Sequence, residues 1–423
     1  MLTTHKIQGA GGVGGGGGYF LAQTAVSGTA VNVYGIDVNS SGDIVFGGTY
    51  SSNDIVGIVD AGGNLLVNKS FTNTYNPPSQ CKDVKFTPSG NIVGLFDSAS
   101  NDLLIEFQVD GTVNWSTFSD FSGIYTPYAL AINGSSGDIY TIGSYRQSPY
   151  AAADWDILIN RYSSSGGRQG SQTQNTGYYQ FMNYADIGID SSNNVYFSTN
   201  FYDLGAQEFG LAYVRKVSST LSTSGGWVRT RGVTSGQYTL THAAAVDSSD
   251  NVIIVGETPD PTFKSPYIIK FNSSGTEQWQ RRLTHSLNDN ISTYHVTTDA
   301  SDNIYVGGTG GYFFKYNSSG SLLWQRKLVL SGTAQQINRI AVDDTNEAVL
   351  IAGTNCIAKL PADGSGTGTY GNFVYSDPSS FTSNTATLGQ PYTTGSLVGT
   401  SVTDRASTSS SSDQAITLTT STI

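Results

Sequence analysis

Residues 246–258, VDSSDNVIIVGET, are one copy of a motif that recurs along the chain. Close copies are TDASDNIYVGGT at 298–309, IDVNSSGDIVFGGT at 36–49 and IDSSNNVYFST at 189–199. In each copy a short strand ends near an Asp, a small polar turn follows, and an apolar strand begins. Such turn residues tolerate positive φ or bond their own backbone, so the recurring Asp is expected to form the turn rather than bind a ligand.

Two further strands complete each repeat. A third strand is clearest as YIIKFN (267–272), and a fourth carries a tryptophan, as in TEQWQRRL (276–283) and SLLWQRKL (321–328). Four strands repeated about every 44 to 57 residues are typical of a propeller blade. With about seven copies, the sequence predicts an all-β, seven-bladed β-propeller.

A register match predicts how the ring closes. The segment 19–39 aligns with 323–344; both contain SGTA, and Phe20 falls where Trp324 stands. Tyr19, Phe20 and Leu21 therefore begin a strand, expected over 19–26, that completes the last blade as its outermost strand. The predicted layout is a Gly-rich arm (1–18), the propeller (19–365) and a Ser/Thr-rich, β-prone tail for assembly or anchoring (366–423).

The repeat resembles the SBBP and NHL types of β-propeller repeat found in bacteria and phages. The resemblance is carried by 246–256, by 298–308 and by KYNSSGSLLW at 315–324. It covers about residues 19 to 365 and implies a propeller fold, while propellers host enzymes, scaffolds and binders alike.

Composition and charge exclude several classes of function. Charged residues make up 13% of the 423 residues, and 21 Lys+Arg against 32 Asp+Glu give a net charge of −11. A negative chain repels phosphate backbones and anionic lipids, so we expect neither nucleic-acid binding nor membrane insertion. The first residues, MLTTHKIQGA, contain no apolar core, so no signal peptide is predicted.

The sequence contains no recognisable catalytic constellation. We therefore expect no enzyme activity, no catalytic residues and no cofactor. His242 and His295 begin first strands of adjacent repeats, but with His285 they are expected to bind no metal, because no ligand cluster accompanies them. One third-strand position repeats a basic residue, which is expected to have a structural partner such as an inter-blade carboxylate or a strand-end carbonyl: Arg161, Lys216, Lys270, Lys315 and Lys359.

Long connections rich in aromatic residues are expected on one face of the ring. In a four-stranded blade the second turn and the link to the next blade emerge together, and insertions on one face are how repeat proteins build binding surfaces. The predicted binding residues are Tyr145, Tyr150, Trp155, Tyr178, Tyr179, Phe201, Tyr202 and Phe263. The alternative is that these aromatics only hold the loops against the ring.

Composition at the two ends suggests where the protein works. Residues 370–423 are rich in Ser and Thr and poor in apolar surface, so the isolated protein is expected to be a folded ring with mobile ends that an assembly fixes. The leading hypothesis is a non-enzymatic phage virion component, such as a tail, fibre or other appendage protein. Its partners would be other virion proteins, copies of itself, or a host-surface glycan or protein. The alternative is a bacterial extracellular adhesion module that binds carbohydrate or protein.

Overall fold

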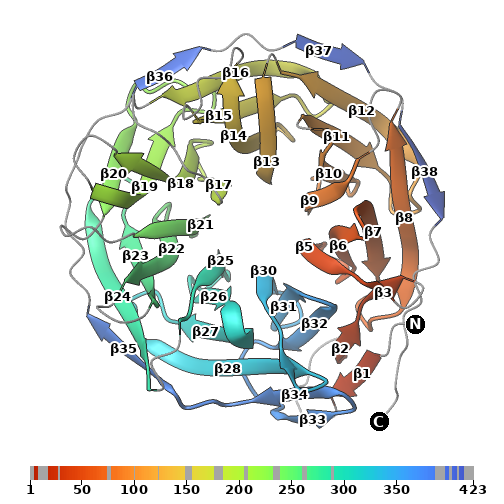
Figure 1. The fold of residues 1–423 in the computed structure, drawn as a ribbon, viewed down its shortest axis with the longest axis vertical. Helices are drawn as coiled ribbons and strands as arrows, with labels where there is room; N and C mark the ends of the chain where they lie inside the picture. The colour runs from red at the N-terminus through yellow and green to blue at the C-terminus, as the bar shows by residue number, and fades with distance from the viewer. Residues whose placement is uncertain are drawn as a thin grey trace.

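Antiparallel sheets stand radially around a central axis, as the blades of a propeller do (Figure 1). The computed structural model describes residues 4–7, 18–26, 29–73, 78–99, 101–121, 123–147, 155–175, 184–203, 208–231, 239–259, 264–286, 290–385, 396–399, 403–406 and 409–413. Within these ranges the one helical element is the 3₁₀ turn η1 (Thr309–Gly311).

Six blades each fold from four consecutive strands, the first strand lying nearest the axis. Blade 1 comprises β5 (Asn32–Val38), β6 (Ile44–Tyr50), β7 (Asn53–Val59) and β8 (Leu65–Asn73), and blade 2 comprises β9 (Gln80–Phe86), β10 (Ile92–Asp97), β11 (Asp102–Phe107) and β12 (Val113–Asp120). Blade 3 comprises β13 (Gly123–Ile132), β14 (Ile139–Gln147), β15 (Asp156–Tyr162) and β16 (Arg168–Asn175), and blade 4 comprises β17 (Ala185–Ile189), β18 (Val195–Asp203), β19 (Glu208–Val217) and β20 (Trp227–Arg231). Blade 5 comprises β21 (Leu240–Val246), β22 (Val252–Pro259), β23 (Lys264–Phe271) and β24 (Glu277–His285), and blade 6 comprises β25 (Thr293–Thr298), β26 (Ile304–Gly308), β27 (Tyr312–Tyr316) and β28 (Leu322–Leu330).

The remaining sheet closes the ring and takes strands from both ends of the repeat region. It joins β30 (Ile337–Asp343), β31 (Ala348–Gly353) and β32 (Cys356–Pro361) to β2 (Tyr19–Gln23) and β1 (Thr4–Ile7). The predicted seven-bladed propeller is corrected accordingly: the ring consists of six complete blades and this one composite closing sheet. The physical reason is that the chain after β32 supplies no tryptophan-bearing fourth strand, so the edge of β32 pairs with β2 instead.

The N-terminal segment also differs from its prediction. β2 is not the outermost strand, because β1 pairs with its other edge, with Lys6 opposite Phe20. Residues 25–26 leave the sheet as β3 (Ala25–Val26) and pair with β4 (Thr29–Ala30). Part of the predicted Gly-rich arm is therefore a strand of the closing sheet.

The recurring Asp forms the first turn of its blade, as the sequence predicts. Asp247 Oδ1 accepts from the backbone N–H groups of Ser249 (3.0 Å) and Asn251 (2.9 Å). Asp250 lies at φ 61° in the same turn and accepts from the N–H of Ser191 in the preceding blade at 2.8 Å. An aspartate tolerates this left-handed conformation because its side chain is short and polar. Each turn is thereby stabilised internally and joined to its neighbour.

The repeated third-strand cations have structural partners of two kinds, carboxylates and backbone carbonyl oxygens. Lys270 lies 2.7 Å from Asp247 of its own blade and donates at 3.3 Å to Ser318 O of the next blade. Lys359 repeats this arrangement with Asp343 (3.0 Å) and with Ala61 O of blade 1, across the closure. These cations fasten neighbouring sheets and are not grouped as a ligand site.

Four blades carry a tryptophan on the outer strand, and in blade 5 this residue fastens the blade to the third turn of the next. Trp279 Nε1 donates to Ser318 O at 3.1 Å, and its ring covers Gly320, whose φ is +79°. A Cβ added at Gly320 would lie 2.8 Å from the Trp279 ring, so glycine is required there for conformation and for space. Phe20 covers Gly63 in the same way, which extends the contact across the closing sheet.

The C-terminal segment lies around the outside of the ring (Figure 1). Its strands add to outer blade edges in reverse order: β34 (Phe373–Ser376) on β28, β35 (Phe381–Thr385) on β24, β36 (Ser396–Gly399) on β16, β37 (Thr403–Ala406) on β12 and β38 (Ser409–Asp413) on β8. The short strands β33 (Gly368–Tyr370) and β29 (Thr333–Ala334) pair with β34 and β28. The expectation that only other chains would fix this tail is therefore corrected, because its described strands pair with the chain's own blades. We call the strands β34 to β38 the outer belt.

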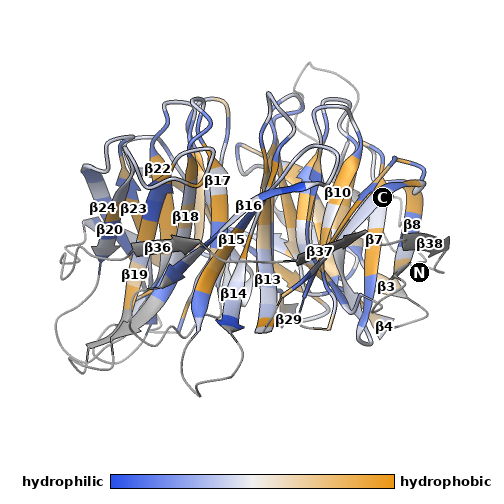
Figure 2. Ribbon diagram, turned by 90° about the horizontal axis from the view of Figure 1, so that it is seen from above, coloured by the Kyte–Doolittle hydropathy of each residue, from blue (hydrophilic) through white to orange (hydrophobic). Residues whose placement is uncertain are grey.

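Apolar side chains of neighbouring sheets pack together in shared clusters. Hydrophobic residues accordingly lie along the strands in Figure 2. Three aromatics of the outer belt, Phe373, Tyr375 and Phe381, are almost fully buried and extend this core outward. Both cysteines, Cys81 and Cys356, are buried and unpaired thiols. Burial raises the pKa of Cys356 to about 12, which keeps the thiol protonated.

Candidate functional site

The inner strands share one irregularity that builds a site on the axis. Six of them contain a β-bulge at the same position, and a bulge re-aims the side chain of its extra residue. The bulged residues are Tyr34, Lys82, Tyr128, His242, Tyr294 and Asn338. Tyr184 stands at the corresponding place, directly before β17. All seven sheets of the ring thus direct one such residue toward the axis.

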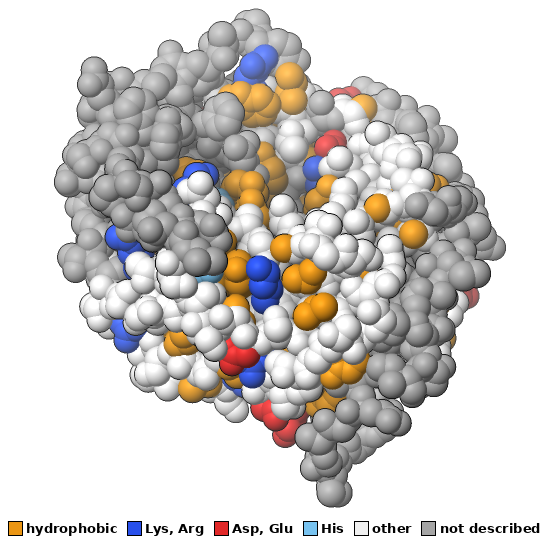
Figure 3. All heavy atoms as spheres, turned by 60° about the horizontal axis from the view of Figure 1, so that its bottom comes forward, with side chains coloured by type: hydrophobic (Ala, Val, Ile, Leu, Met, Phe, Trp, Pro, Cys, Tyr) orange, Lys and Arg blue, Asp and Glu red, His pale blue; other side chains and the backbone are white. Residues whose placement is uncertain are grey.

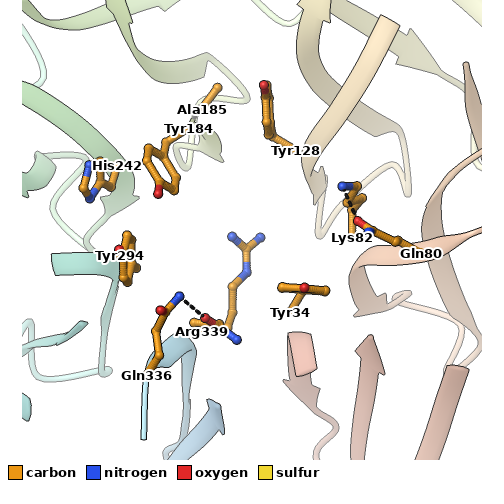
Figure 4. A pocket seen from close by; sticks show the side chains of 11 residues that line it. Tyr34, Gln80, Lys82, Tyr128, Tyr184, Ala185, His242, Tyr294, Gln336 and Arg339 are labelled. Atoms are coloured by element: carbon orange, nitrogen blue, oxygen red, sulfur yellow. Dashed lines mark hydrogen bonds between the residues drawn. The ribbon is translucent and has the colours of Figure 1, made fainter. Parts of the chain in front are cut away.

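These seven residues line a single cavity on the axis, which we call the axial cavity. Its volume is about 340 Å³, within the range of about 300–1,000 Å³ that small-molecule sites have. The other lining residues are Gln80, Ala185, Gln336 and Arg339. Figure 4 shows side chains from every side of the ring around an open centre. Seen obliquely in Figure 3, the ring shows basic side chains (blue) beside side chains of the hydrophobic class, which there includes tyrosine (orange).

One wall of the axial cavity is a cluster of three mutually adjacent aromatic rings from blades 4, 5 and 6. The ring centroids of Tyr184 and His242 are 4.1 Å apart, and those of His242 and Tyr294 are 5.2 Å apart with nearly parallel planes. His242 Nδ1 lies 2.5 Å from Thr293 O, and a carbonyl can only accept, so Nδ1 carries the proton. Burial lowers the pKa of His242 to about 4, so its ring is neutral at neutral pH.

The floor of the axial cavity is a buried ion cluster that crosses the axis. Arg339, on β30 of the closing sheet, pairs with Asp83 of blade 2 and, at 3.5 Å, with Asp186 of blade 4. His295 of blade 6 lies 3.6 Å from Asp186. Burial raises the pKa of Asp186 although Arg339 acts against it. Because one guanidinium contacts sheets on opposite sides, this cluster ties the ring together across its centre.

Lys82 is the other basic residue of the lining. Its Nζ donates to Gln80 Oε1 at 2.6 Å and lies 3.7 Å from Asp97 Oδ2. Burial lowers the pKa of Lys82, while Asp97 raises it. No Asp or Glu is among the described residues that line the axial cavity. The cavity wall therefore offers tyrosine, amide and basic groups, in a chain where acidic residues outnumber basic ones.

Two of the predicted binding residues, Tyr145 and Trp155, have described side chains, and neither lines this cavity. Tyr145 is buried, 3% exposed, and packs with Phe121, Tyr125 and Leu158. Trp155 is half-buried, and the guanidinium of Arg146 lies 5.4 Å from its ring centroid. Phe201 and Tyr202 belong to β18, and their side chains lie outside the described part of the structure. Tyr150, Tyr178, Tyr179 and Phe263 fall outside the described residues altogether.

The other predicted positions are located as follows. Tyr19, Phe20 and Leu21 lie on β2, which pairs with β32, and Phe20 and Leu21 are fully buried. His242 and His295 are not equivalent: His242 occupies the bulge position, whereas His295 follows the bulged Tyr294. Within the described ranges no group of three or more His, Cys, Asp or Glu is arranged to hold a metal ion.

Sequence reasoning missed the tyrosines of the axial cavity. A signal for them exists: VYGID, PYALA, NYADI and TYHVT each place a tyrosine at the same point of an otherwise apolar first strand. Its meaning depends on the bulge, which the pattern of residues alone does not reveal.

No protein-family model matches the sequence, and no curated protein is significantly similar to it. Among solved structures, the RRP9 WD40 repeats match with a TM-score of 0.53 at 10% identity, covering 85% of this chain and 97% of that one. A streptogramin B lyase matches with a TM-score of 0.47 at 14% identity, covering 81% and 97%. Drosophila Semaphorin 1b, extracellular domains 1–2, matches with a TM-score of 0.46 at 9% identity, covering 80% and 87%. Within the described ranges, no helix is long and apolar enough to cross a membrane. The likeness to the WD40 repeats supports the β-propeller fold and nothing finer.

Proposed function

We propose that this protein is a non-enzymatic recognition module whose binding site is the axial cavity together with the surrounding end of the ring. One observation carries the proposal: a bulge, or its equivalent, directs one side chain from every sheet into the same cavity. A β-bulge interrupts the ladder of hydrogen bonds, so its repetition around the ring favours a role for the residues it re-aims.

The chemistry of the lining favours binding over catalysis. Its titratable side chains are Lys82, Arg339, His242 and tyrosines. Arg339 engages Asp83 and Asp186 in the floor, and His242 is held by Thr293 beside two tyrosines. A hydrolase or lyase requires an acid and a base placed against the substrate, whereas Arg339 and His242 are engaged by neighbouring protein groups.

A binding comparison of matched variants tests this proposal. The wild-type protein and a Tyr184→Ala/Tyr294→Ala double variant are applied to arrays of glycans and of surface proteins. We expect the wild type to retain specific ligands that the double variant loses. The thermal midpoint of the double variant should show that its ring remains folded. Ligands retained equally by both proteins would contradict a binding site in the axial cavity. A cleaved ligand would contradict the non-enzymatic part of the proposal.

We further propose that the module works in a phage virion, as part of a tail, fibre or other appendage, with other virion proteins or copies of itself as neighbours. The resemblance of the repeat to bacterial and phage propellers and the Ser/Thr-rich, lysine-poor composition support this setting. A host-surface glycan or protein would then occupy the axial cavity. The alternative is an extracellular adhesion module of a bacterium, which the polar, aromatic lining suits equally. Mass spectrometry of purified particles tests the setting: a stoichiometric virion protein supports the first, and a protein found only on or outside bacterial cells supports the second.

A further inference from the structure

The axial cavity has a chemical character that narrows its ligand, granted that it is the binding site proposed above. Its lining combines the ring faces of Tyr184 and Tyr294, the amides of Gln80, Gln336 and Asn338, and the amine of Lys82. Figure 4 shows the tyrosines, the two glutamines and Lys82 around the open centre, with Arg339 extending toward it from below. A ligand must therefore present C–H faces to tyrosine and polar groups to amides within one small volume.

Sugar rings meet this requirement. A pyranose has an apolar face that lies against an aromatic ring and a rim of hydroxyls that both donate and accept hydrogen bonds. The aromatic wall is held in place, because His242 is anchored to Thr293 O and the rings of His242, Tyr184 and Tyr294 all contact one another. A cavity of about 340 Å³ is near the lower end for small-molecule sites, which suits a chain-terminal residue rather than a long chain.

The charges in the lining indicate the sign and size of the ligand's charge. The guanidinium of Arg339 already pairs with both Asp83 and Asp186. Among the described residues, the amine of Lys82 has one carboxylate within 4 Å, that of Asp97 at 3.7 Å, and it also donates to Gln80. With no acidic residue among the described lining residues, a cationic ligand would meet only like charges. One amine matches one negative charge, and a carboxylate suits it better than a phosphate dianion, which would need several donors.

We propose that the axial cavity binds a sugar residue that carries a carboxylate, with Lys82 facing the carboxylate and the tyrosines facing the ring. Lys82 and Tyr294 touch the ligand. His242 is a positioning residue that holds the aromatic wall.

Ligand-observed NMR titration tests the proposal with four probes: glucuronic acid, N-acetylneuraminic acid, glucose and glucosamine. We expect one of the acidic sugars to bind at about 1 mM or tighter, at least about tenfold better than glucose, and glucosamine to bind weakest. Lys82→Met should reduce affinity for the acidic sugar about tenfold and leave affinity for glucose unchanged. Tyr294→Leu should reduce both affinities. Lys327→Met, the same change on the outer strand β28, is the matched control and should alter neither.

Three results would overturn the proposal. The first is no binding of either acidic sugar up to about 10 mM. The second is equal or better binding of glucose or glucosamine. The third is a crystal structure of the protein soaked in the acidic sugar with water only in the axial cavity. If array ligands are lost in the Tyr184→Ala/Tyr294→Ala variant but are not displaced by acidic sugars, the ligand class is wrong while the proposed binding site stands. If the array ligands bind that variant as well as they bind the wild type, the proposed function itself fails.

Discussion

At the scale of single residues, the position of the bulge recurs around the ring, whereas the amino acid that occupies it changes from sheet to sheet. The bulge of six inner strands holds tyrosine, lysine, histidine or asparagine, while its position in the strand stays the same. Variation of the residue at a fixed position is expected where the fold sets the direction of a side chain and the ligand sets its chemistry.

The first residue-scale prediction concerns the protonation of His242. Burial lowers its pKa to about 4, well below the ordinary 6.5. As the pH falls from about 6.5 to about 4, the unfolded chain gains a proton that the folded chain does not, so stability is lost across that window. We expect the wild type to lose about 2 kcal/mol more than His242→Leu between pH 7 and pH 4.5.

NMR of histidine Cε1 resonances measures the titration directly, and urea denaturation at the two pH values measures the stability. His295 is buried in both proteins, so it cancels in the comparison. A His242 resonance that titrates near pH 6.5 would show that the ring is solvated and the aromatic wall open.

The second residue-scale prediction compares two glycines with similar backbone conformations. Gly275 has φ +78°, and a Cβ there would lie 2.6 Å from the Trp227 ring; Gly90 has φ +86° and nothing within 4 Å. Gly90→Ala should cost about 1–2 kcal/mol of stability from left-handed strain alone. Gly275→Ala should cost a further 1–3 kcal/mol or so, because the tryptophan must move. Equal losses in urea denaturation would mean that the tryptophan contact adds nothing to the joint between blades.

At the scale of elements, the outer belt changes the meaning of the Ser/Thr-rich tail. Composition predicted a segment with too little apolar surface to order itself. The structure instead adds its strands to blade edges, where main-chain hydrogen bonds need no particular side chain. Three aromatics, Phe373, Tyr375 and Phe381, are buried, and three residues in so long a segment leave little trace in its composition.

Truncation at two points separates the parts of the outer belt. A chain ending at 371 loses β34 and β35 with their buried aromatics, each of which contributes about 1.5–3 kcal/mol when buried. A chain ending at 395 keeps both strands. We expect a large fall in thermal midpoint for the first and a small one for the second. Limited proteolysis of the full chain should spare the segment up to 385, and rapid cleavage before Phe373 would contradict the packing described here.

Some elements of the fold could be predicted from the sequence, and others could not. The strands, their turns, the pairing partners of Lys270 and the register of Phe20 with Trp324 follow from local patterns repeated many times. The composite closing sheet with β1 outside β2, the belt and the bulges depend on edges that meet only once the ring has formed. A site assembled from one residue per blade likewise cannot be recognised until the blades are placed around an axis.

At the scale of the whole molecule, the ring is closed twice, at its rim and at its centre. At the rim, β2 pairs with β32 and Phe20 covers Gly63 of blade 1. At the centre, Arg339 reaches from the closing sheet to blades 2 and 4. A propeller whose blades contacted only their neighbours could open at one joint. A contact across the axis couples sheets that do not otherwise touch, so the ring should unfold in one transition.

Replacement of Arg339 tests that coupling. Arg339→Met preserves most of the side-chain volume but leaves Asp83 and Asp186 buried without their cation, and breaking a buried pair in this way costs about 3–5 kcal/mol. The loss should shrink at acid pH, because a protonated Asp is far less costly to bury than an ionised one, and burial already raises the pKa of Asp186. Thermal unfolding of both proteins from pH 7 to pH 4 measures the difference, with Lys327→Met as a control for loss of a positive charge at the rim. A gap between the Arg339→Met variant and the wild type that stays constant or widens toward pH 4 would mean that the cost is one of packing. In that case the cluster would only fill space at the centre of the ring and would not couple the sheets across it.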